Sequence, residues 1–514
     1  MAVGASARVS NGTQPSRFIR KISNCRRLTK LHGSYLASNS FFLSCKSFPQ
    51  SRAFSCSASV KDNPKPVLSE MRRTSVEDPN AFELSSLTAL STLDGRYWEK
   101  VKDLAHFMSE CGLIRFRILF EIKWLIKLSQ IPEVTEVSSF SEEALCFLEG
   151  VIEGFSMSDA LEKCQSHPEI AKVLEFFHFA CTSEDINNLA HALMLKGALN
   201  TVMLPVIDEL IRALYKMGKD NSHILMLSRT HGQPAMPTTL GKEMATFASR
   251  LSRERHHISQ VALLGKFAGA VRNYNAHLVA YPDINWPRVA EEFVKSLGLN
   301  FNPYVTQIEP HDCMVKLFFA IIQFDIILMD FDSDIWGYIS VSYFKQITKA
   351  GEIGSSTMPH KVNPIDFENS EGNLGKSNAG LSHLSMKLPI SCWQVNEARL
   401  SEDLDQSWEV LAEPIQTVLN FLSRDKTSFT MFSNFGLLFT LIDIYTVYEK
   451  LKELTRGRAV MQESIRELII GLELPEDAKA NLLNLTPHTY IGAAVNLAKN
   501  VDMFVDLVNG NNAL

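Results

Sequence analysis

Long segments of this chain carry apolar residues at helical spacing. Between residues 101 and 130 apolar positions recur every three or four residues, as in an amphipathic helix. Residues 189–217, 239–267 and 312–346 are nearly free of Gly and Pro and are apolar on more than one face. A 29-residue helix would be about 43 Å long. No segment alternates convincingly over five or more residues, so the pattern predicts an all-α protein with a long central helical bundle.

The sequence CTSEDINN at residues 181–188 has the composition of a helix start. Thr182 followed three residues later by Asp185 matches the capping-box spacing, with Asp in place of Glu or Gln. The free N–H groups and partial positive charge of a helix N-terminus also attract anions. Thr182 and Ser183 can therefore cap the helix, bind an anionic ligand, or divide the two tasks.

A loop with many chemically active side chains follows the third long segment. Residues 354–364 read GSSTMPHKVNP, and the Gly and two prolines exclude a helix interior or a central strand. The loop supplies two adjacent hydroxyls, an imidazole, an ammonium group and a carboxamide, from Ser355, Ser356, His360, Lys361 and Asn363. An ordinary solvated connector can have a similar composition, so these residues alone leave both interpretations open.

This loop resembles the signature loop of the fumarase/aspartase superfamily, whose members eliminate fumarate. His360 and the flanking sequences AGEI (350–353) and IDFEN (365–369) are similar to the adenylosuccinate lyase branch. Fumarases usually have Gly and argininosuccinate lyases usually Gln where this chain has His360. The resemblance runs from about residue 83 to about residue 495, and it implies an all-α homotetramer with shared active sites.

The resemblance also implies a reaction that needs no metal or organic cofactor. Fumarate would be eliminated from adenylosuccinate and from the succinyl-aminoimidazole-carboxamide ribotide of purine synthesis. Ser355 would remove the carbon proton, and His231, within the motif THG, would protonate the departing nitrogen. The implied substrate-binding residues are Arg96, Tyr97, Thr182, Ser183, Thr230, Gln307, Ser356, Lys361, Val362, Asn363 and Asn369. Glu309 is a candidate partner that orients a histidine, and His311 either belongs to the site or lies on the surface.

Composition places the chain among ordinary globular proteins. Of its 514 residues 46% are hydrophobic and 21% charged, and the length suggests two or three domains. Nine cysteines are scattered without paired spacing or a nearby histidine pattern. This distribution argues against a disulfide framework or a zinc site and favours a reducing compartment.

Charge is distributed very unevenly along the chain. Residues 1–60 hold nine Lys and Arg, thirteen Ser and no Asp or Glu. The remainder has 42 of the 51 basic residues and all 57 acidic ones, a net charge of −15. We therefore expect no nucleic-acid-binding face, which needs clustered positive charge. The first 60 residues are typical of a transit peptide for the plastid or, second, the mitochondrion; a disordered tail without a targeting role is the alternative.

The resemblance and the composition divide the chain into five parts. We expect a transit peptide (1–60), a linker (61–82), an N-terminal helical domain (83–181), a central bundle (182–394) and a C-terminal helical domain (395–514). The chain is shorter than the family pattern between Phe155 and Phe176 and again after Gln394, where substrate-binding stretches are expected. Residues 419–446 have no family counterpart, and Asp443 and the short apolar run argue against a membrane span.

Two kinds of function remain open from the sequence. The first is a lyase of purine nucleotide synthesis, with argininosuccinate lyase or fumarase as the nearest enzymatic alternatives. The second is a catalytically impaired variant, truncated or mis-spliced, that acts only as an oligomer partner. The loss of one rod of a bundle would expose apolar faces on its neighbours.

Overall fold

The computed structural model describes residues 85, 88–154, 164–347, 358, 360–390, 404, 407–422, 451, 460–472 and 474–503. Contacts divide the chain into two units, each described by itself. In the smaller unit the described residues are 85, 88–98 and Ser342–Lys345. Its main feature is a turn over residues 92–97. All other described residues belong to the larger unit, which contains Glu99–Val341 and Gln346–Leu514.

Helices dominate the described residues, which confirms the predicted fold class. The helices are α2 (Trp98–Val101), η1 (Lys102–Leu104), α3 (Ala105–Met108), α4 (Glu110–Leu128), α5 (Glu142–Glu153), η2 (Ile170–Phe176), α7 (Ser183–Ala198), η3 (Leu199–Met203), α8 (Leu204–Asp220), α9 (Leu240–Gln260), α10 (Asn275–Ala280), α11 (Trp286–Ser296), α12 (Asp312–Ser340), α13 (Ile365–Lys387), η5 (Trp408–Leu411), α15 (Ala412–Leu422), α17 (Gln462–Ile470), α18 (Glu476–Asn484), α19 (Ala494–Lys499) and η6 (Val501–Met503). The strands are β1 (Leu225–Thr230), β2 (Gln233–Thr239), β3 (Leu264–Gly265) and β4 (Asn300–Phe301).

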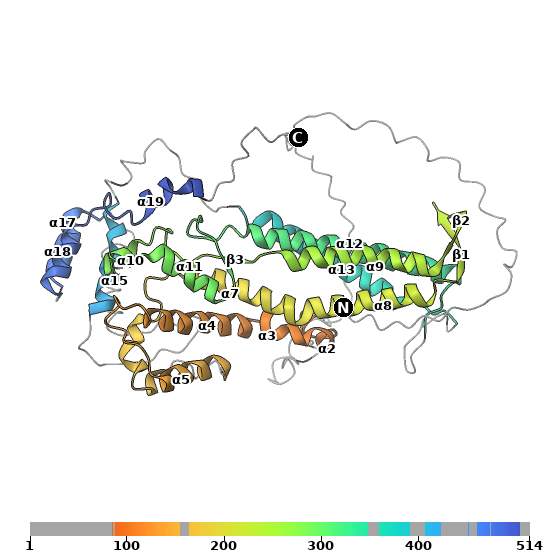
Figure 1. Cartoon of the computed structure of the whole chain (residues 1–514), viewed down its shortest axis with the longest axis horizontal. Coiled ribbons are helices and arrows are strands. Elements are labelled where there is room, and N and C mark those ends of the chain that lie inside the picture. Colours follow the sequence, from red (N-terminus) through yellow and green to blue (C-terminus); the bar gives the residue numbers. More distant parts are fainter. Residues whose placement is uncertain are drawn as a thin grey trace, which may run out of the picture. The chain divides into compact units, whose positions relative to one another are not determined.

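Four long helices, α8, α9, α12 and α13, form the bundle, as Figure 1 shows. The end of α8 lies beside the start of α9, where the N–H of Gly241 donates to the carbonyl of Asn221. The rings of Phe247 on α9 and Phe331 on α12 pack edge to face at 5.3 Å. Phe331 also contacts Phe367 near the start of α13. The hairpin before α9, the end of α12 and the start of α13 therefore share one end of the bundle.

A single continuous helix links the two ends. Residues from Ser183 to Asp220 form one helical run of 38 residues, with a π-helical turn, η3, in the middle. By length and composition alone this run could cross a membrane, a test that core helices of soluble proteins also pass. Here its first half packs on α4 and its second half on α9, as bundle helices do.

A cluster of aromatic rings fills the core beside α4. Trp124 packs edge to face on Phe267 at 4.4 Å and on Phe293 at 5.2 Å, and the His277 ring lies 4.9 Å from that of Trp286. Burial lowers the pKa of His277 to about 3, so this imidazole is neutral at physiological pH. Towards the C-terminus, η5, α15, α17 and α18 share a second apolar core.

Three expectations about the elements were wrong in part. The helix predicted at 239–267 ends at Gln260, because residues after it pair with the 300–302 segment, where Asn300 N–H donates to Leu263 O. The helix predicted at 312–346 ends at Ser340. The absence of strands was wrong for β1 and β2, which pair antiparallel. Both strands are largely exposed, so no alternation of buried and exposed residues marks them in the sequence.

Candidate functional site

Thr182 and Ser183 lie at the start of α7. Thr182 is the N-cap residue, and its N–H donates to Asp185 Oδ2 at 2.9 Å, as the capping-box spacing predicts. Thr182 is half-buried and Ser183 is exposed. The helix start is therefore both capped from within and accessible to an anion.

A buried ion pair fixes this helix start to the segment that follows α9. Asp185 Oδ1 accepts from the N–H of Ala268 at 3.0 Å, and Oδ2 accepts from Gly269 at 3.1 Å. Lys266 Nζ lies 2.9 Å from Asp185 Oδ1, and both side chains are fully buried. The sequence analysis missed Lys266. Its signal was a lone Lys in the apolar run LLGKFAGA (263–270), because a buried Lys needs a charged partner.

A second charged pair holds the residues before Thr182. His178 donates its backbone N–H to Glu121 Oε2 at 2.9 Å, and its Nδ1 lies 2.8 Å from Oε1. His178 and Ala180 both adopt left-handed backbone angles, with φ of 61° and 54°. Burial acts to lower the pKa of His178, but the hydrogen bond and charge of Glu121 outweigh it and raise the pKa above its usual value. The sequence analysis missed this pair as well.

Gln307 lies on the loop before α12 and is exposed. Two residues later, Glu309 is buried, and its Oε1 accepts from Asn302 Nδ2 at 3.0 Å. His311 Nδ1 lies 3.2 Å from Glu309 Oε2 but makes no hydrogen bond there, so the role of Glu309 in orienting a histidine stays a prediction, with His311 as the histidine it would orient. The alternative that His311 is only a surface residue was wrong, since its side chain is 11% exposed.

His231 lies at the tip of the β1–β2 hairpin. Thr230 pairs with Gln233, which leaves His231 and Gly232 as a two-residue loop with φ of 53° and 74°. Positive φ at both positions is the requirement of a type I′ turn. Arg229 Nη1 donates to the carbonyl of Gly232 at 3.2 Å and supports the turn. His231 is exposed in this turn.

The described part of the signature loop lies immediately before α13. Lys361 and Val362 are exposed and Asn363 is half-buried, while Asn369 is exposed in the second turn of α13. The N–H of Lys361 donates to the carbonyl of Met358 at 2.9 Å. Ser355 and Ser356 lie outside the described residues. The proposed base is therefore named from sequence alone.

Arg96 and Tyr97 belong to the smaller unit. They lie in the turn over residues 92–97, where the N–H of Tyr97 donates to the carbonyl of Thr92 at 2.9 Å. Arg96 is exposed and Tyr97 is half-buried. Nothing relates this unit to the remaining site residues.

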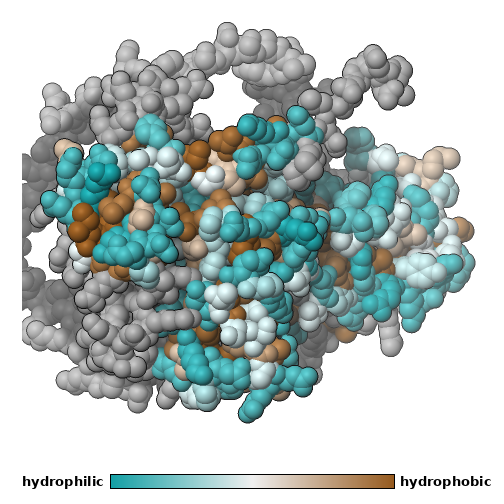
Figure 2. Space-filling view, turned by 60° about the vertical axis from the view of Figure 1, so that its left-hand side comes forward, coloured by the Kyte–Doolittle hydropathy of each residue, from teal (hydrophilic) through white to brown (hydrophobic). Residues whose placement is uncertain are grey.

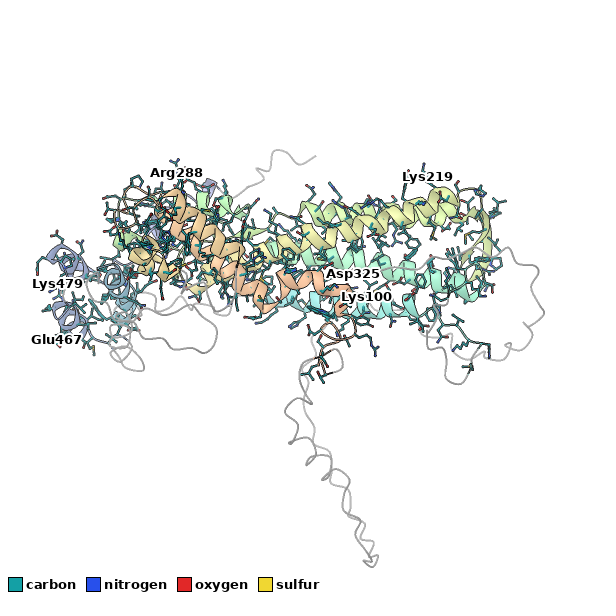
Figure 3. All side chains as sticks on the ribbon, turned by 90° about the horizontal axis from the view of Figure 1, so that it is seen from below. Lys100, Lys219, Arg288, Asp325, Glu467 and Lys479 are labelled. Carbon is teal, nitrogen blue, oxygen red and sulfur yellow. The ribbon has the colours of Figure 1, made fainter. Side chains whose placement is uncertain are left out.

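Within the larger unit the predicted site residues fall into two groups at opposite ends of the bundle. One group is Thr182, Ser183 and Gln307; the other is Thr230, His231, Lys361, Val362, Asn363 and Asn369. The 38-residue helix between them is about 57 Å long at 1.5 Å per residue. Figure 3 shows Lys219, beside the hairpin end, far from Arg288 on α11 at the other end. A single copy therefore does not bring the two groups together.

Metal ligands do not cluster in the described parts of the chain. No group of three or more His, Cys, Asp or Glu side chains there is placed to hold an ion. The five cysteines that the structure describes are unpaired thiols. The expected independence from metals and organic cofactors stays a prediction.

Comparisons with known proteins agree with this architecture. Residues 147–377 match a family model described as lyase, and residues 372–491 match one described as adenylosuccinate lyase C-terminal. Together with the helical bundle, these matches define a lyase of the fumarase/aspartase fold. The muconate lactonizing enzyme of Pseudomonas putida (3-carboxy-cis,cis-muconate lactonizing enzyme) aligns over 78% of this chain and 96% of its own, with 20% identity and a TM-score of 0.44.

Two bacterial relatives narrow the class. The adenylosuccinate lyase of Haemophilus influenzae is 47% identical over 473 aligned positions, which take up 81% of this chain and 99% of the relative. That of Escherichia coli is 47% identical over 471 positions, with the same coverage. The chain belongs to the adenylosuccinate lyase family.

Proposed function

We propose that this chain is a C–N lyase that eliminates fumarate from adenylosuccinate, giving AMP, and from the succinyl-aminoimidazole-carboxamide ribotide. The observation that carries the proposal is 47% identity across nearly the full length of bacterial adenylosuccinate lyases. The residues that the reaction needs are present, among them His231, Ser355 and Lys361.

The proposed chemistry follows from the side chains of the two groups and the signature loop. Ser355 takes the proton beside the substrate carboxylate, and His231 gives a proton to the departing nitrogen. Proton removal places charge on the carboxylate, and Lys361 and Asn363 stabilise it with an ammonium group and an amide donor. Thr182 and Ser183 hold a substrate carboxylate at the start of α7.

Product analysis tests the proposal. The purified full-length chain, at high concentration, is incubated with adenylosuccinate, argininosuccinate or malate, and fumarate and AMP are measured by mass spectrometry. We expect slow formation of both products from adenylosuccinate only, and none with His231→Ala. Fumarate from argininosuccinate or malate but not from adenylosuccinate would move the chain to another branch.

We further propose a homotetramer whose active sites are shared between copies. Two observations support it: the two groups of site residues lie about 57 Å apart along one copy, and α12 exposes apolar side chains. Phe319, Ile326 and Trp336 are 55%, 47% and 47% exposed, respectively. Figure 2 shows hydrophobic patches among hydrophilic ones on one face of the molecule. Exposed apolar area of this kind is typical of surfaces that bind other subunits.

Mixed oligomers test the sharing of sites. Ser183→Ala removes a group at one end of the bundle and His231→Ala one at the other, so each variant alone is inactive. When the two are unfolded and reassembled together in equal amounts, about a quarter of the sites receive both intact groups. Recovered fumarate release supports shared sites, and continued inactivity of the mixed assembly would contradict them.

A second candidate function, an impaired variant that serves as an oligomer partner, rests on the alignments. The alignment with the Haemophilus influenzae relative is 473 positions long, but it covers only 81% of the 514 residues of this chain, which is fewer than 473 residues. The alignment therefore includes positions at which the relative has a residue and this chain has none. This is in line with lost segments after Phe155 and after Gln394. Each charge-assisted contact contributes about 1.5–3 kcal/mol, so the loss of two or three contacts weakens substrate binding about a thousandfold.

We propose that residues 1–60 direct the protein to an organelle. Their basic, Ser-rich and acid-free composition supports import into the plastid, with the mitochondrion as second choice. Fusion of this segment to a fluorescent protein in plant cells tests it. Plastid fluorescence is expected, and diffuse cytosolic fluorescence would argue against a transit peptide.

A further inference from the structure

The loop before α12 and the start of α7 meet through one histidine. His311 Nδ1 lies 3.2 Å from Glu309 Oε2, on its own loop, and Nε2 lies 3.9 Å from Glu184 Oε1, on α7. Neither contact is a hydrogen bond: Nδ1 has no hydrogen-bond partner within the described parts of the chain, Nε2 is too far from Glu184, and both contacts are ion pairs only when the imidazole is protonated. The side chains of Glu309, His311 and Glu184 are 2%, 11% and 22% exposed, so the three groups interact largely out of water.

The rest of the loop is arranged to hold this histidine. Glu309 Oε2 accepts the backbone N–H of His311, while Oε1 accepts from Asn302 beside β3. His311 has a φ of 60°, a sparsely populated backbone region that persists only where surrounding contacts enforce it. The two oxygens of Glu309 thus fix the backbone of His311 and the side chain of Asn302, and the imidazole is held in place through this loop backbone.

His311 affects the pKa values of both carboxyl groups beside it, those of Glu309 and Glu184. Burial acts to raise the pKa of Glu309, but hydrogen bonds from His311 and Asn302 outweigh it and lower the pKa. Burial raises the pKa of Glu184, although the charges of His311 and Lys266 and the backbone amide of Glu309 oppose it. The amide of Glu309 therefore also links the loop to α7.

Each side of this link carries a residue that the resemblance assigns to substrate. Ser183 directly precedes Glu184, and Gln307 lies two residues before Glu309. We infer that His311 is a positioning residue, which clamps the Gln307 loop to the start of α7 so that Ser183 and Gln307 meet the substrate with fixed geometry. This role rests on the proposed function, because it concerns the same site.

Three variants separate the clamp from general stability. His311→Asn keeps a donor for Glu309 and tolerates the positive φ, but cannot reach Glu184. Glu184→Gln removes the charge on the other side of the same ion pair. His257→Asn is the matched control, since His257 pairs with Glu254 at 3.0 Å on the exposed face of α9.

Hydrogen exchange of the full-length chain is the first measurement. We expect His311→Asn and Glu184→Gln each to speed amide exchange about tenfold in residues 182–186 and 305–311 together, with no change in the hairpin. The double variant should be no faster than Glu184→Gln alone, because the contact that His311→Asn removes is already removed by Glu184→Gln. Unchanged exchange in either segment, or additive effects in the double variant, would overturn the clamp.

Binding of adenylosuccinate by calorimetry is the second measurement. His311→Asn should weaken binding about tenfold, but not in a Gln307→Ala background, where the positioned group is already absent. An equal loss in both backgrounds would contradict positioning through Gln307. If the unmodified chain binds no adenylosuccinate, the exchange result alone decides whether the clamp exists, and product analysis decides the proposed function.

Discussion

Lys266 and Asp325 are both buried ionisable residues, but only Lys266 has an oppositely charged partner in the part of the chain that the structure describes. Lys266 is fully buried but pairs with Asp185. Asp325, near the middle of α12 (Figure 3), is also buried, and its Oδ2 has no hydrogen-bond partner among the described residues. Burial raises the pKa of Asp325 to about 6, and a hydrogen bond from Ser377 only partly opposes this. Such a carboxyl destabilises the folded chain once it ionises.

Replacement of Asp325 by Asn should therefore stabilise the protein at neutral pH. The folded carboxyl keeps its proton up to about pH 6, whereas the unfolded one loses it near 3.8, so stability falls as the pH rises between these values. Asp325→Asn removes this loss, worth up to about 3 kcal/mol at pH 7 and little at pH 4. Urea unfolding at both pH values measures the gain.

Asp330 supplies the control on the same helix. Its side chain is half exposed and pairs with Arg250. Asp330→Asn should therefore change stability by at most about 1 kcal/mol, and in the destabilising direction. If Asp330→Asn stabilised the protein as much as Asp325→Asn does, the stabilisation would come from the loss of a negative charge on α12 and not from the burial of Asp325.

His231 and Ser355 are expected to act in one elimination step. His231→Ala and Ser355→Ala should each lower fumarate release about 10²–10⁴-fold, with the oligomer unchanged in sedimentation. Because acid and base serve the same step, the double variant should be little worse than either single one. Near-normal turnover of Ser355→Ala would end its assignment as the base.

The long helices could be predicted from the sequence, whereas the β1–β2 hairpin could not. The long apolar runs at 101–130, 189–217, 239–267 and 312–346 extend over many residues, so the existence and type of the helices in these four segments were predictable. Their ends were not, because contacts with distant residues, such as Asn300 with Leu263, determine where the chain leaves the helix. The hairpin has no buried face and hence no period, although HG at 231–232 has the turn chemistry of a two-residue loop.

Site residues were predictable to the extent that they form local motifs. The cap at Thr182 follows from spacing alone, whereas the roles of His231 and Lys361 are implied by the resemblance and stay predictions. The contacts of Lys266 with Asp185 and of His311 with Glu184 join residues more than 80 positions apart. No spacing rule covers such pairs, since only the packed bundle brings them together.

The turn at Gly232 should matter more for catalysis than for stability. Gly232 has a φ of 74°, and a Cβ there would meet no atom within 4 Å. Gly232→Ala therefore adds only backbone strain, about 1 kcal/mol. A shift of the turn by about 1 Å would displace His231 and lower turnover about a hundredfold.

Gly150 is the matched control for this substitution. It lies in α5, where an added Cβ also meets nothing within 4 Å. Gly150→Ala should leave turnover unchanged and stabilise the chain by about 0.5–1 kcal/mol through helix propensity. Thermal unfolding and fumarate release are measured for both variants, and equal effects on turnover would exclude a special role for the turn.

We propose that the whole molecule combines a full set of reacting groups with an interrupted binding surface. His231, Ser355, Lys361 and Asn363 are all present, while by the proposal the segments expected after Phe155 and after Gln394 are missing. The active site further depends on the proposed assembly of several copies. We therefore expect the chain as written to turn over far more slowly than a chain with those segments restored, because binding contacts and positioning are both lost.

The expected slow turnover of this chain is tested most directly by comparing fumarate release from adenylosuccinate in two proteins. The first is the present chain; the second has both family segments restored and residues 419–446 removed. We expect the restored chain to be at least about a thousandfold faster, and to lose this activity with His231→Ala. Equal rates in the two proteins would contradict the loss of binding contacts, and no fumarate from the restored chain would contradict the lyase function itself.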